Sequence, residues 1–168
     1  MNDQTDTFNK ILAQYADGPT LLEQALSGLT EADFDFTLSE DSWTIRQIVH
    51  HIADGDDIWK ICIKTALGNS DALFSLQWYT VKSQMDWSES WAYSCRGHAS
   101  SLALYRANRH HIVDLLEHIP GALEKSVRFD RPGREEIRIT VFDVVELHVR
   151  HLTEHIESIH AIRRAHGK

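Results

Sequence analysis

The sequence has little of what several protein classes require. Its two cysteines, Cys62 and Cys95, form neither a disulfide framework nor a CxxC pair, so we expect a reducing, cytoplasmic compartment. No apolar run approaches the roughly 20 residues that span a bilayer, and the first residues lack the basic-then-apolar pattern of an export signal. A formal net charge of −8 without a basic patch argues against nucleic acid or an anionic membrane surface as a partner.

Several catalytic motifs are also missing. The chain has no P-loop, no GxGxxG and no GxSxG sequence. A di-iron bundle would need Glu-x-x-His on two helices, and no candidate histidine has an acidic residue three positions before it. Residues 151–155 spell the HxxEH string of inverted zinc peptidases, but those enzymes take a third ligand well downstream, and this sequence ends at Lys168. We interpret that match as chance and Glu154 as a solvated residue, with a proton-transfer role as the open alternative.

What the sequence does contain favours one helical domain, residues 1–168. A 168-residue chain with 42% hydrophobic residues can bury a core without disulfides or metal staples. Thr44 and Gln47 form a capping box, and Asp143 is placed to help a second cap. Apolar residues at helical spacing predict four helices: Phe8 to Leu26 with a kink or short break at Gly18-Pro19, Thr44 to about Leu67, Cys95 to Pro120, and Thr140 to near the C-terminus.

Two stretches between these helices follow other patterns. Residues 69–92 combine tryptophans with polar residues and suit a long crossover with one helical turn. Val127 to Ile139 alternates weakly around Arg131-Pro132-Gly133, which predicts a small β-hairpin. The expected fold is therefore an all-α four-helix bundle, with a long crossover between the second and third helices and a hairpin before the fourth.

The unusual feature of the composition is eleven histidines. Because a helix turns by roughly 100° per residue, the apolar stripe shows which of them face inward. In the second helix His51 borders the stripe, whereas His50 points nearly opposite and is predicted to lie on the surface. In the last helix His148 and His155 lie within the stripe and His151 lies at its border.

This arrangement predicts a metal site. Histidines three and four residues apart lie on adjacent helical turns and can share one ion. The alternative is a satisfied polar core, but several buried imidazoles would compete for partners, whereas a divalent cation takes their lone pairs. An isolated interior histidine such as His98 is interpreted as a hydrogen-bonded core residue. Cys62 and Cys95 fall on apolar faces and are interpreted as core residues.

Two segments resemble the DinB-like superfamily, specifically its YfiT-like branch. Trp43–Asp54 resembles the signature in which a tryptophan opens the second helix and a histidine before an Ile-Ala-Asp segment binds metal; that histidine corresponds to His51. His148–Ile159 is similar to the C-terminal H-x-x-x-H helix of the family, whose two ligands correspond to His151 and His155.

The resemblance extends from about Pro19 to Ile159. The stretch Pro132–Thr140 is similar to the short segment that leads into the last helix in this branch. Ser158 departs from the pattern, because many relatives carry glutamine or histidine there, and this puts a substrate-binding role of that position in doubt. His148 shares the helix face of the ligands without being a family ligand, so we expect it in the substrate pocket.

The resemblance implies a four-helix bundle, usually a homodimer, with one zinc or nickel ion on three histidines and an open coordination position. Members of the family are described as metal-dependent hydrolases or as transferases acting with low-molecular-weight thiols. An open position can bind a thiol and deprotonate it, or bind water and lower its pKa. We expect a thiol S-transferase acting on a small-molecule thiol and an electrophile. A metal-dependent hydrolase and a non-catalytic metal- or ligand-binding stress-response module are the open alternatives.

Overall fold

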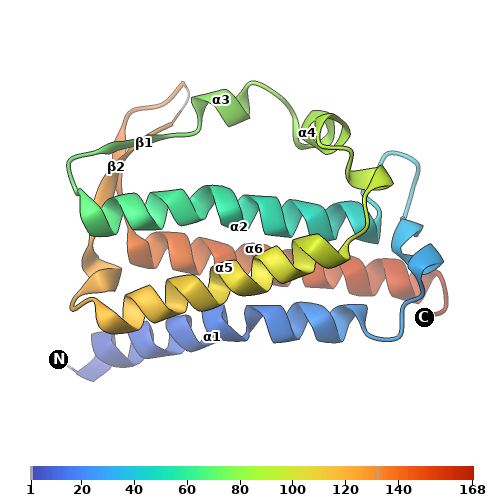
Figure 1. Cartoon of the computed structure of the whole chain (residues 1–168), viewed down its shortest axis with the longest axis horizontal. Helices are drawn as coiled ribbons and strands as arrows, with labels where there is room; N and C mark the ends of the chain where they lie inside the picture. Colours follow the sequence, from blue (N-terminus) through green and yellow to red (C-terminus); the bar gives the residue numbers. More distant parts are fainter. Residues whose placement is uncertain (1, 132) are drawn as a thin grey trace.

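The structure, a computed structural model, describes residues 2–131 and 133–168, with side chains for residues 6–131 and 133–168. Four long helices run side by side (Figure 1): α1 (Asn2–Leu26), α2 (Ile45–Gly68), α5 (Ala99–His118) and α6 (Val141–Ala165). Both α1 and α2 pack against α5 and α6. The predicted four-helix bundle is confirmed. Within the described residues, no helix has the length and apolar character needed to cross a membrane.

Two capping boxes define where α2 and α6 begin. At the start of α2, Thr44 Oγ1 accepts a hydrogen bond from the Gln47 N–H at 3.2 Å, and Gln47 Oε1 accepts one from the Thr44 N–H at 2.8 Å. At the start of α6, Thr140 and Asp143 form the same reciprocal pair. Each pair satisfies two backbone donors that a helix start leaves free, so both predicted caps are confirmed.

Helix α1 continues through Pro19, so the short break expected there is wrong. Proline has no N–H to donate to the carbonyl four residues earlier, which here is that of Tyr15. Arg109 Nη1, from α5, donates to this carbonyl at 3.2 Å instead. A Cβ atom at Gly18 would lie 2.7 Å from the Tyr105 hydroxyl, so any other residue at this position would force the Tyr105 side chain to move.

The crossover contains more structure than the single helical turn predicted for it. It includes four short elements: β1 (Leu73–Ser75), α3 (Gln77–Thr80), α4 (Gln84–Ser90) and the 3-10 helix η2 (Tyr93–Cys95). A further 3-10 helix, η1 (Glu31–Asp35), follows α1, and η3 (Ala122–Glu124) follows α5. The predicted hairpin is present as β2 (Ser126–Asp130) and β3 (Ile137–Thr140), whereas Pro132 of its predicted turn lies outside the described residues.

The crossover is tied to the hairpin by a three-stranded sheet that was not predicted. β1 pairs in parallel with β2, with Phe74 beside Phe129, and β2 pairs antiparallel with β3. Trp59 of α2 packs on both phenylalanines, at ring-centroid distances of 5.6 Å from Phe74 and 5.4 Å from Phe129. The sheet therefore holds the start of the crossover against α2, and α3 and α4 follow along that helix (Figure 1).

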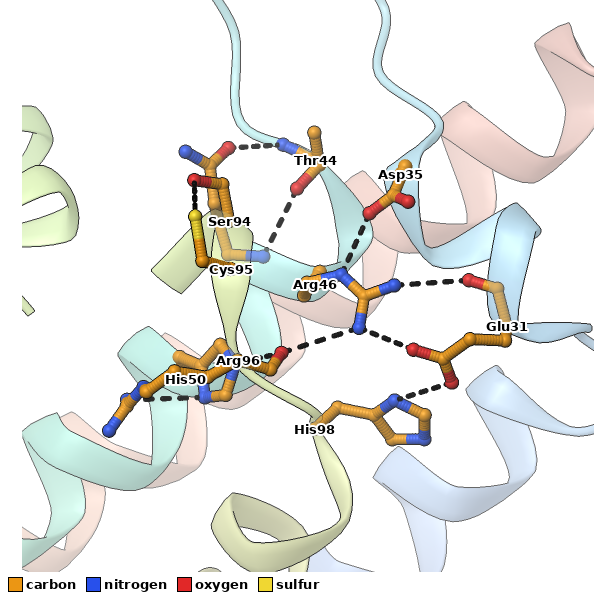
Figure 2. A network of polar contacts seen from close by, with 10 residues as sticks. Glu31, Asp35, Thr44, Arg46, His50, Ser94, Cys95, Arg96 and His98 are labelled. Atoms are coloured by element: carbon orange, nitrogen blue, oxygen red, sulfur yellow. Dashed lines mark hydrogen bonds and ion pairs between the residues drawn. The ribbon is translucent and has the colours of Figure 1, made fainter. Parts of the chain in front are cut away.

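The third long helix begins later than expected, at Ala99. Cys95 consequently lies in η2 and is exposed, so its assignment to the core is wrong, whereas Cys62 is buried as expected. His98 is partly buried and stacks on Phe34 at 3.7 Å, with Nδ1 3.6 Å from Glu31 Oε2 (Figure 2). Its Nδ1 makes no hydrogen bond within the described residues, so the expected hydrogen-bonded core histidine is also wrong.

His50 is fully buried, which corrects its predicted surface position. Its Nδ1 lies 2.7 Å from Ser101 Oγ. Its Nε2 lies 3.3 Å from the Arg96 carbonyl oxygen (Figure 2). An apolar stripe identifies the buried face only when the opposite face meets water. Here η2 and the beginning of α5 cover that opposite face of α2, and they supply polar partners to the residue on it.

The interior is divided along the bundle axis. One apolar cluster includes Ile63 and Ile112 toward the sheet end, and a second includes Ile52 and Leu152 toward the other end. The layer of the bundle between these clusters contains three buried polar side chains: Asp56, Arg109 and His148.

Candidate metal centre

Three histidines converge on one point between α2 and α6. His51 comes from α2, and His151 and His155 come from successive turns of α6. The Nε2 atom of His151 lies 3.0 Å from the Nε2 atoms of both His51 and His155. All three ligand atoms lie within 4.8 Å of one another, and each side chain is partly buried. The structure thus brings together the three residues that the sequence singled out as candidate ligands.

The donor set fits a divalent cation. A neutral imidazole nitrogen carries either one hydrogen or one lone pair, so the single Nε2 of His151 is poorly suited to serve two facing imidazoles at once. A cation at the common point accepts a lone pair from each ring. Nitrogen ligands of tetrahedral zinc at roughly 2.0–2.1 Å stand about 3.3 Å apart, close to the 3.0 Å between the Nε2 atom of His151 and that of each neighbouring histidine.

The electrostatics of the metal-free site favour neutral rings. Burial is the main reason that the pKa of His51 is lowered to about 3, with a further contribution from His155. Burial likewise lowers the pKa of His151 to about 2, and repulsion from the neighbouring rings adds to this. The pKa of His155 is also lowered, again chiefly by burial. At neutral pH all three rings keep the lone pairs that a metal ion needs.

Trp43, the residue just before the α2 cap, lies beside the histidines. Its ring meets His51 edge-on at a centroid distance of 4.5 Å and stacks parallel to His155 at 6.2 Å. It also lines a cavity of about 220 Å³ that borders His155 and Ser158. Ser158 Oγ donates to the Glu154 carbonyl at 3.0 Å and so makes a local helical contact. Glu154 is exposed, in agreement with its interpretation as a solvated residue.

A pocket of about 310 Å³ opens beside the histidines. His51 and His151 form part of its wall, and His148 lines it too, where the substrate pocket was expected. The crossover supplies the outer wall with Tyr79 and Gln84, whose side chains are joined by a 2.8 Å hydrogen bond from the tyrosine hydroxyl. The remaining lining is Gly55, Ile58, Trp59 and Leu147. The pocket is therefore largely apolar, with imidazole groups on one side.

Beneath the pocket, His148 is connected to a buried ion pair. Its Nδ1 lies 2.8 Å from Asp56 Oδ1, and the same oxygen accepts a hydrogen bond from Arg109 Nε at 2.7 Å. The side chains of Asp56 and Arg109 are 1% and 2% exposed. Helices α2, α5 and α6 each contribute one member of this contact.

The sequence reasoning did not identify Asp56 or Arg109. A signal was nevertheless present, because both lie on apolar stripes of their helices. Asp56 falls between Ile52 and Trp59 at helical spacing. Arg109 falls between Tyr105 and Ile112 in the same way. A carboxylate on one buried stripe and a guanidinium on another can be placed in the core together only if they pair.

Comparisons with known proteins agree with this fold. The family model described as DinB superfamily matches residues 14–159. The protein named "Putative metal-dependent hydrolase YfiT" from Bacillus subtilis (strain 168) is 28% identical over 165 residues, which cover 98% of this chain and 87% of the relative. A "Putative metal-dependent hydrolase" from Oceanobacillus iheyensis is 25% identical over 153 residues, covering 90% and 85% of the two chains.

The solved structure of YfiT from Bacillus subtilis, described as having an unusual four-helix bundle topology, aligns with a TM-score of 0.81 at 25% identity. The alignment covers 99% of this chain and 90% of that chain. The resemblance to the YfiT-like branch drawn from Trp43–Asp54 and His148–Ile159 is therefore confirmed. This chain belongs to the DinB superfamily.

Proposed function

We propose that this protein is a metal-dependent enzyme that activates a low-molecular-weight thiol for transfer to an electrophile. In this proposal His51, His151 and His155 hold one divalent ion, zinc or nickel. The observation that carries the proposal is the convergence of three histidines, two of which, His51 and His151, line an apolar pocket of about 310 Å³. Bound there, the ion supplies Lewis acidity that lowers the pKa of a coordinated thiol or water molecule.

The pocket lining favours a thiol over water as the nucleophile. Among the described residues that line it there is no carboxylate, lysine or arginine. A thiol has a pKa near ~8.5 and needs only a small shift to ionise at neutral pH, whereas water starts near ~15.7 and needs a large one. The apolar side chains of Ile58, Trp59 and Leu147 exclude water and provide a surface for the organic parts of both substrates.

Hydrolysis is the second candidate, and the names of the relatives favour it. Both reported relatives carry the description metal-dependent hydrolase, and the same donor set can lower the pKa of water. The two candidates share the metal site and differ in the nucleophile that occupies the pocket. A direct test of that nucleophile therefore separates them.

The test uses untagged protein loaded with cobalt in place of zinc. Adding cysteine should produce a sulfur-to-cobalt charge-transfer band in the near ultraviolet, and the loaded protein should conjugate cysteine to monochlorobimane in proportion to bound metal. A variant with His51→Ala should lose both signals. If the band is absent and p-nitrophenyl acetate is hydrolysed instead, thiol transfer is wrong and hydrolysis takes its place. Tight cobalt binding with neither reaction would favour a binding module.

We also propose a homodimer, on the basis of the family resemblance. Four amphipathic helices in an acidic chain are compatible with a monomer as well, so solution mass decides the matter. Light scattering at micromolar concentration should give twice the chain mass of 19.3 kDa. A mass equal to one chain would contradict the proposal.

A further inference from the structure

The buried contact among Asp56, Arg109 and His148 is not needed to hold a bundle together. Removing two charges from water costs several kcal/mol per ion, and apolar side chains of similar volume usually stabilise a core equally well. The pair nevertheless lies between two apolar clusters, with both side chains at least 98% buried. The Asp56 oxygen Oδ2 makes no hydrogen bond within the described residues. An arrangement this costly points to a role beyond packing.

Arg109 is held in place independently of the carboxylate. Its guanidinium carbon lies 3.7 Å from the ring centroid of Tyr15 and 4.9 Å from that of Tyr105. Its Nη1 donates to the carbonyl of Tyr15. Burial alone would lower the pKa of Arg109, but the Asp56 carboxylate and the two tyrosines raise it overall. Arg109 is thus a fixed cation, held in position by the two tyrosines, that pairs with Asp56.

The ion pair determines which nitrogen of His148 carries the proton. A carboxylate paired with a guanidinium can only accept hydrogen bonds. His148 Nδ1, 2.8 Å from Asp56 Oδ1, must therefore carry a hydrogen, so in a ring that holds one proton the lone pair lies on Nε2. The ring lines the pocket beside His51 and His151, and no described residue forms a hydrogen bond with its Nε2.

We infer that Asp56 is a positioning residue that fixes His148 with its Nε2 as a hydrogen-bond acceptor for the nucleophile bound in the pocket. The S–H of a thiol, or the O–H of water, donates to this nitrogen and is thereby oriented beside the three histidines. Arg109 supports the arrangement by holding the carboxylate. This inference rests on the proposed function for the identity of the nucleophile, whereas the tautomer that it requires does not depend on any substrate.

The tautomer can be measured by nitrogen NMR on the zinc-loaded protein. The His148 ring nitrogens, assigned by their loss in His148→Asn, should show a protonated Nδ1 and an unprotonated Nε2. Asp56→Asn should shift the ring toward the Nε2–H tautomer, because an amide nitrogen in that place donates instead of accepting. The matched control is Asp57→Asn, the next residue of the same helix, whose half-exposed carboxylate binds Lys60 and not His148. That variant should leave the His148 signals unchanged.

A pair of His148 variants tests the acceptor without disturbing the ion pair. Asparagine places an amide near Nδ1, so His148→Asn can keep the contact with Asp56 but has no group at Nε2. Glutamine reaches the Nε2 position, so His148→Gln restores an acceptor in the pocket. Conjugation of cysteine to monochlorobimane should fall by about 10–100-fold in His148→Asn, chiefly in kcat, with metal content retained. His148→Gln should recover part of that loss.

The failures of this inference and of the proposed function are distinguishable. Absence of the cobalt–sulfur band removes the thiol but leaves the tautomer measurement intact. An Nε2–H tautomer in the unmodified protein would overturn the inference, and so would an Asp56→Asn spectrum that matches the Asp57→Asn spectrum. If Asp56→Asn does not fold, the two His148 variants decide, and equal rates in both would count against an acceptor at Nε2.

Discussion

His50 and His51 are adjacent in the sequence and lie in very different surroundings. His50 is fully buried and finds a partner for each ring nitrogen, in Ser101 and in the Arg96 carbonyl. His51 is only partly buried, and its Nε2 faces two other imidazoles. Burial alone would therefore select His50, whereas the arrangement of the neighbouring rings selects His51 as the candidate ligand.

The difference shows that the partners of a histidine identify its role better than its depth does. A buried ring with two protein hydrogen bonds is a structural residue, because its polar atoms are already satisfied. A ring whose nearest polar neighbours are other neutral rings lacks a suitable hydrogen-bond partner. A cation solves this by accepting the lone pair of each ring. Four predictions test this contrast, and they follow in order of decreasing effect.

The largest effect is expected from His51→Ala on metal binding. Structural zinc sites in small domains bind their ion with a free energy of about 10 kcal/mol or more, so removing one of three ligands here should weaken affinity by about 100-fold or more. His151→Ala and His155→Ala should behave similarly, whereas His50→Ala should bind the ion normally. Elemental analysis and titration calorimetry of untagged protein measure both quantities. Normal binding by His51→Ala together with loss of the ion in His50→Ala would reverse the assignment.

The second effect concerns stability, and here His50→Ala should lose more than His51→Ala. His50→Ala leaves a cavity and removes the partners of Ser101 and of the Arg96 carbonyl, which should lower the free energy of unfolding by about 3 kcal/mol. His51→Ala in the metal-free protein should cost less, because it removes a ring from a crowded group of neutral imidazoles. Urea denaturation in the presence of a chelator compares the two. Equal losses would show that the two rings are not energetically distinct.

The third effect is the pH dependence of the metal-free protein. Burial lowers the folded-state pKa of His51 to about 3 and that of His151 to about 2, whereas both titrate near pH ~6.5 in an unfolded chain. Below pH ~6.5 the unfolded chain therefore binds protons that the folded chain does not, and stability falls as the pH falls. Between about pH 6.5 and about 5.5, these two histidines together should cost about 2 kcal/mol.

Urea denaturation at a series of pH values measures this slope. The double variant His51→Ala/His151→Ala serves as the control and should show a shallower dependence. Saturating zinc should move the acid limb to lower pH, since the ion stabilises the neutral rings by mass action. If the stability of the metal-free, unmodified protein depends on pH as weakly as that of the double variant, the assigned protonation states are wrong.

The smallest effect is the loss of stability expected from Arg46→Met, a variant one helical turn before His50 in α2. Arg46 is nearly buried and reaches Glu31 and Asp35 at 2.7 Å each (Figure 2). The two carboxylates are 68% and 61% exposed, so water and salt screen the attraction, and the loss should be about 1 kcal/mol. The difference in the free energy of unfolding between Arg46→Met and the unmodified protein should shrink in high salt. The metal content of the variant should be unchanged. A loss as large as that of His50→Ala would show that screening is overestimated here.

The sequence predicted the features whose determinants are local. The Thr44–Gln47 cap identified the start of α2, and the spacing within α6 placed His151 and His155 on one face. Local periodicity also predicted the hairpin, because its two strands are close in sequence. Each of these signals is contained within a few residues of chain.

The features that were missed depend on residues distant in sequence. The crossover pairs β1 with β2 more than fifty residues later, and no local pattern determines that register. Burial of His50 depends on η2 covering a face of α2 that the apolar stripe marks as solvent-exposed. Asp56 and Arg109 lie on separate helices, and only the assembled bundle shows that they form a pair.

The proline in α1 has a consequence for how the chain folds. Within α1 the Tyr15 carbonyl has no N–H donor in the following turn, so an isolated α1 segment should break near Pro19 into two short, unstable helices. Arg109 reaches that carbonyl only after α5 has docked against α1. The uninterrupted helix is therefore a product of tertiary assembly, and α1 should gain its full helicity late, in the same kinetic step that buries the guanidinium.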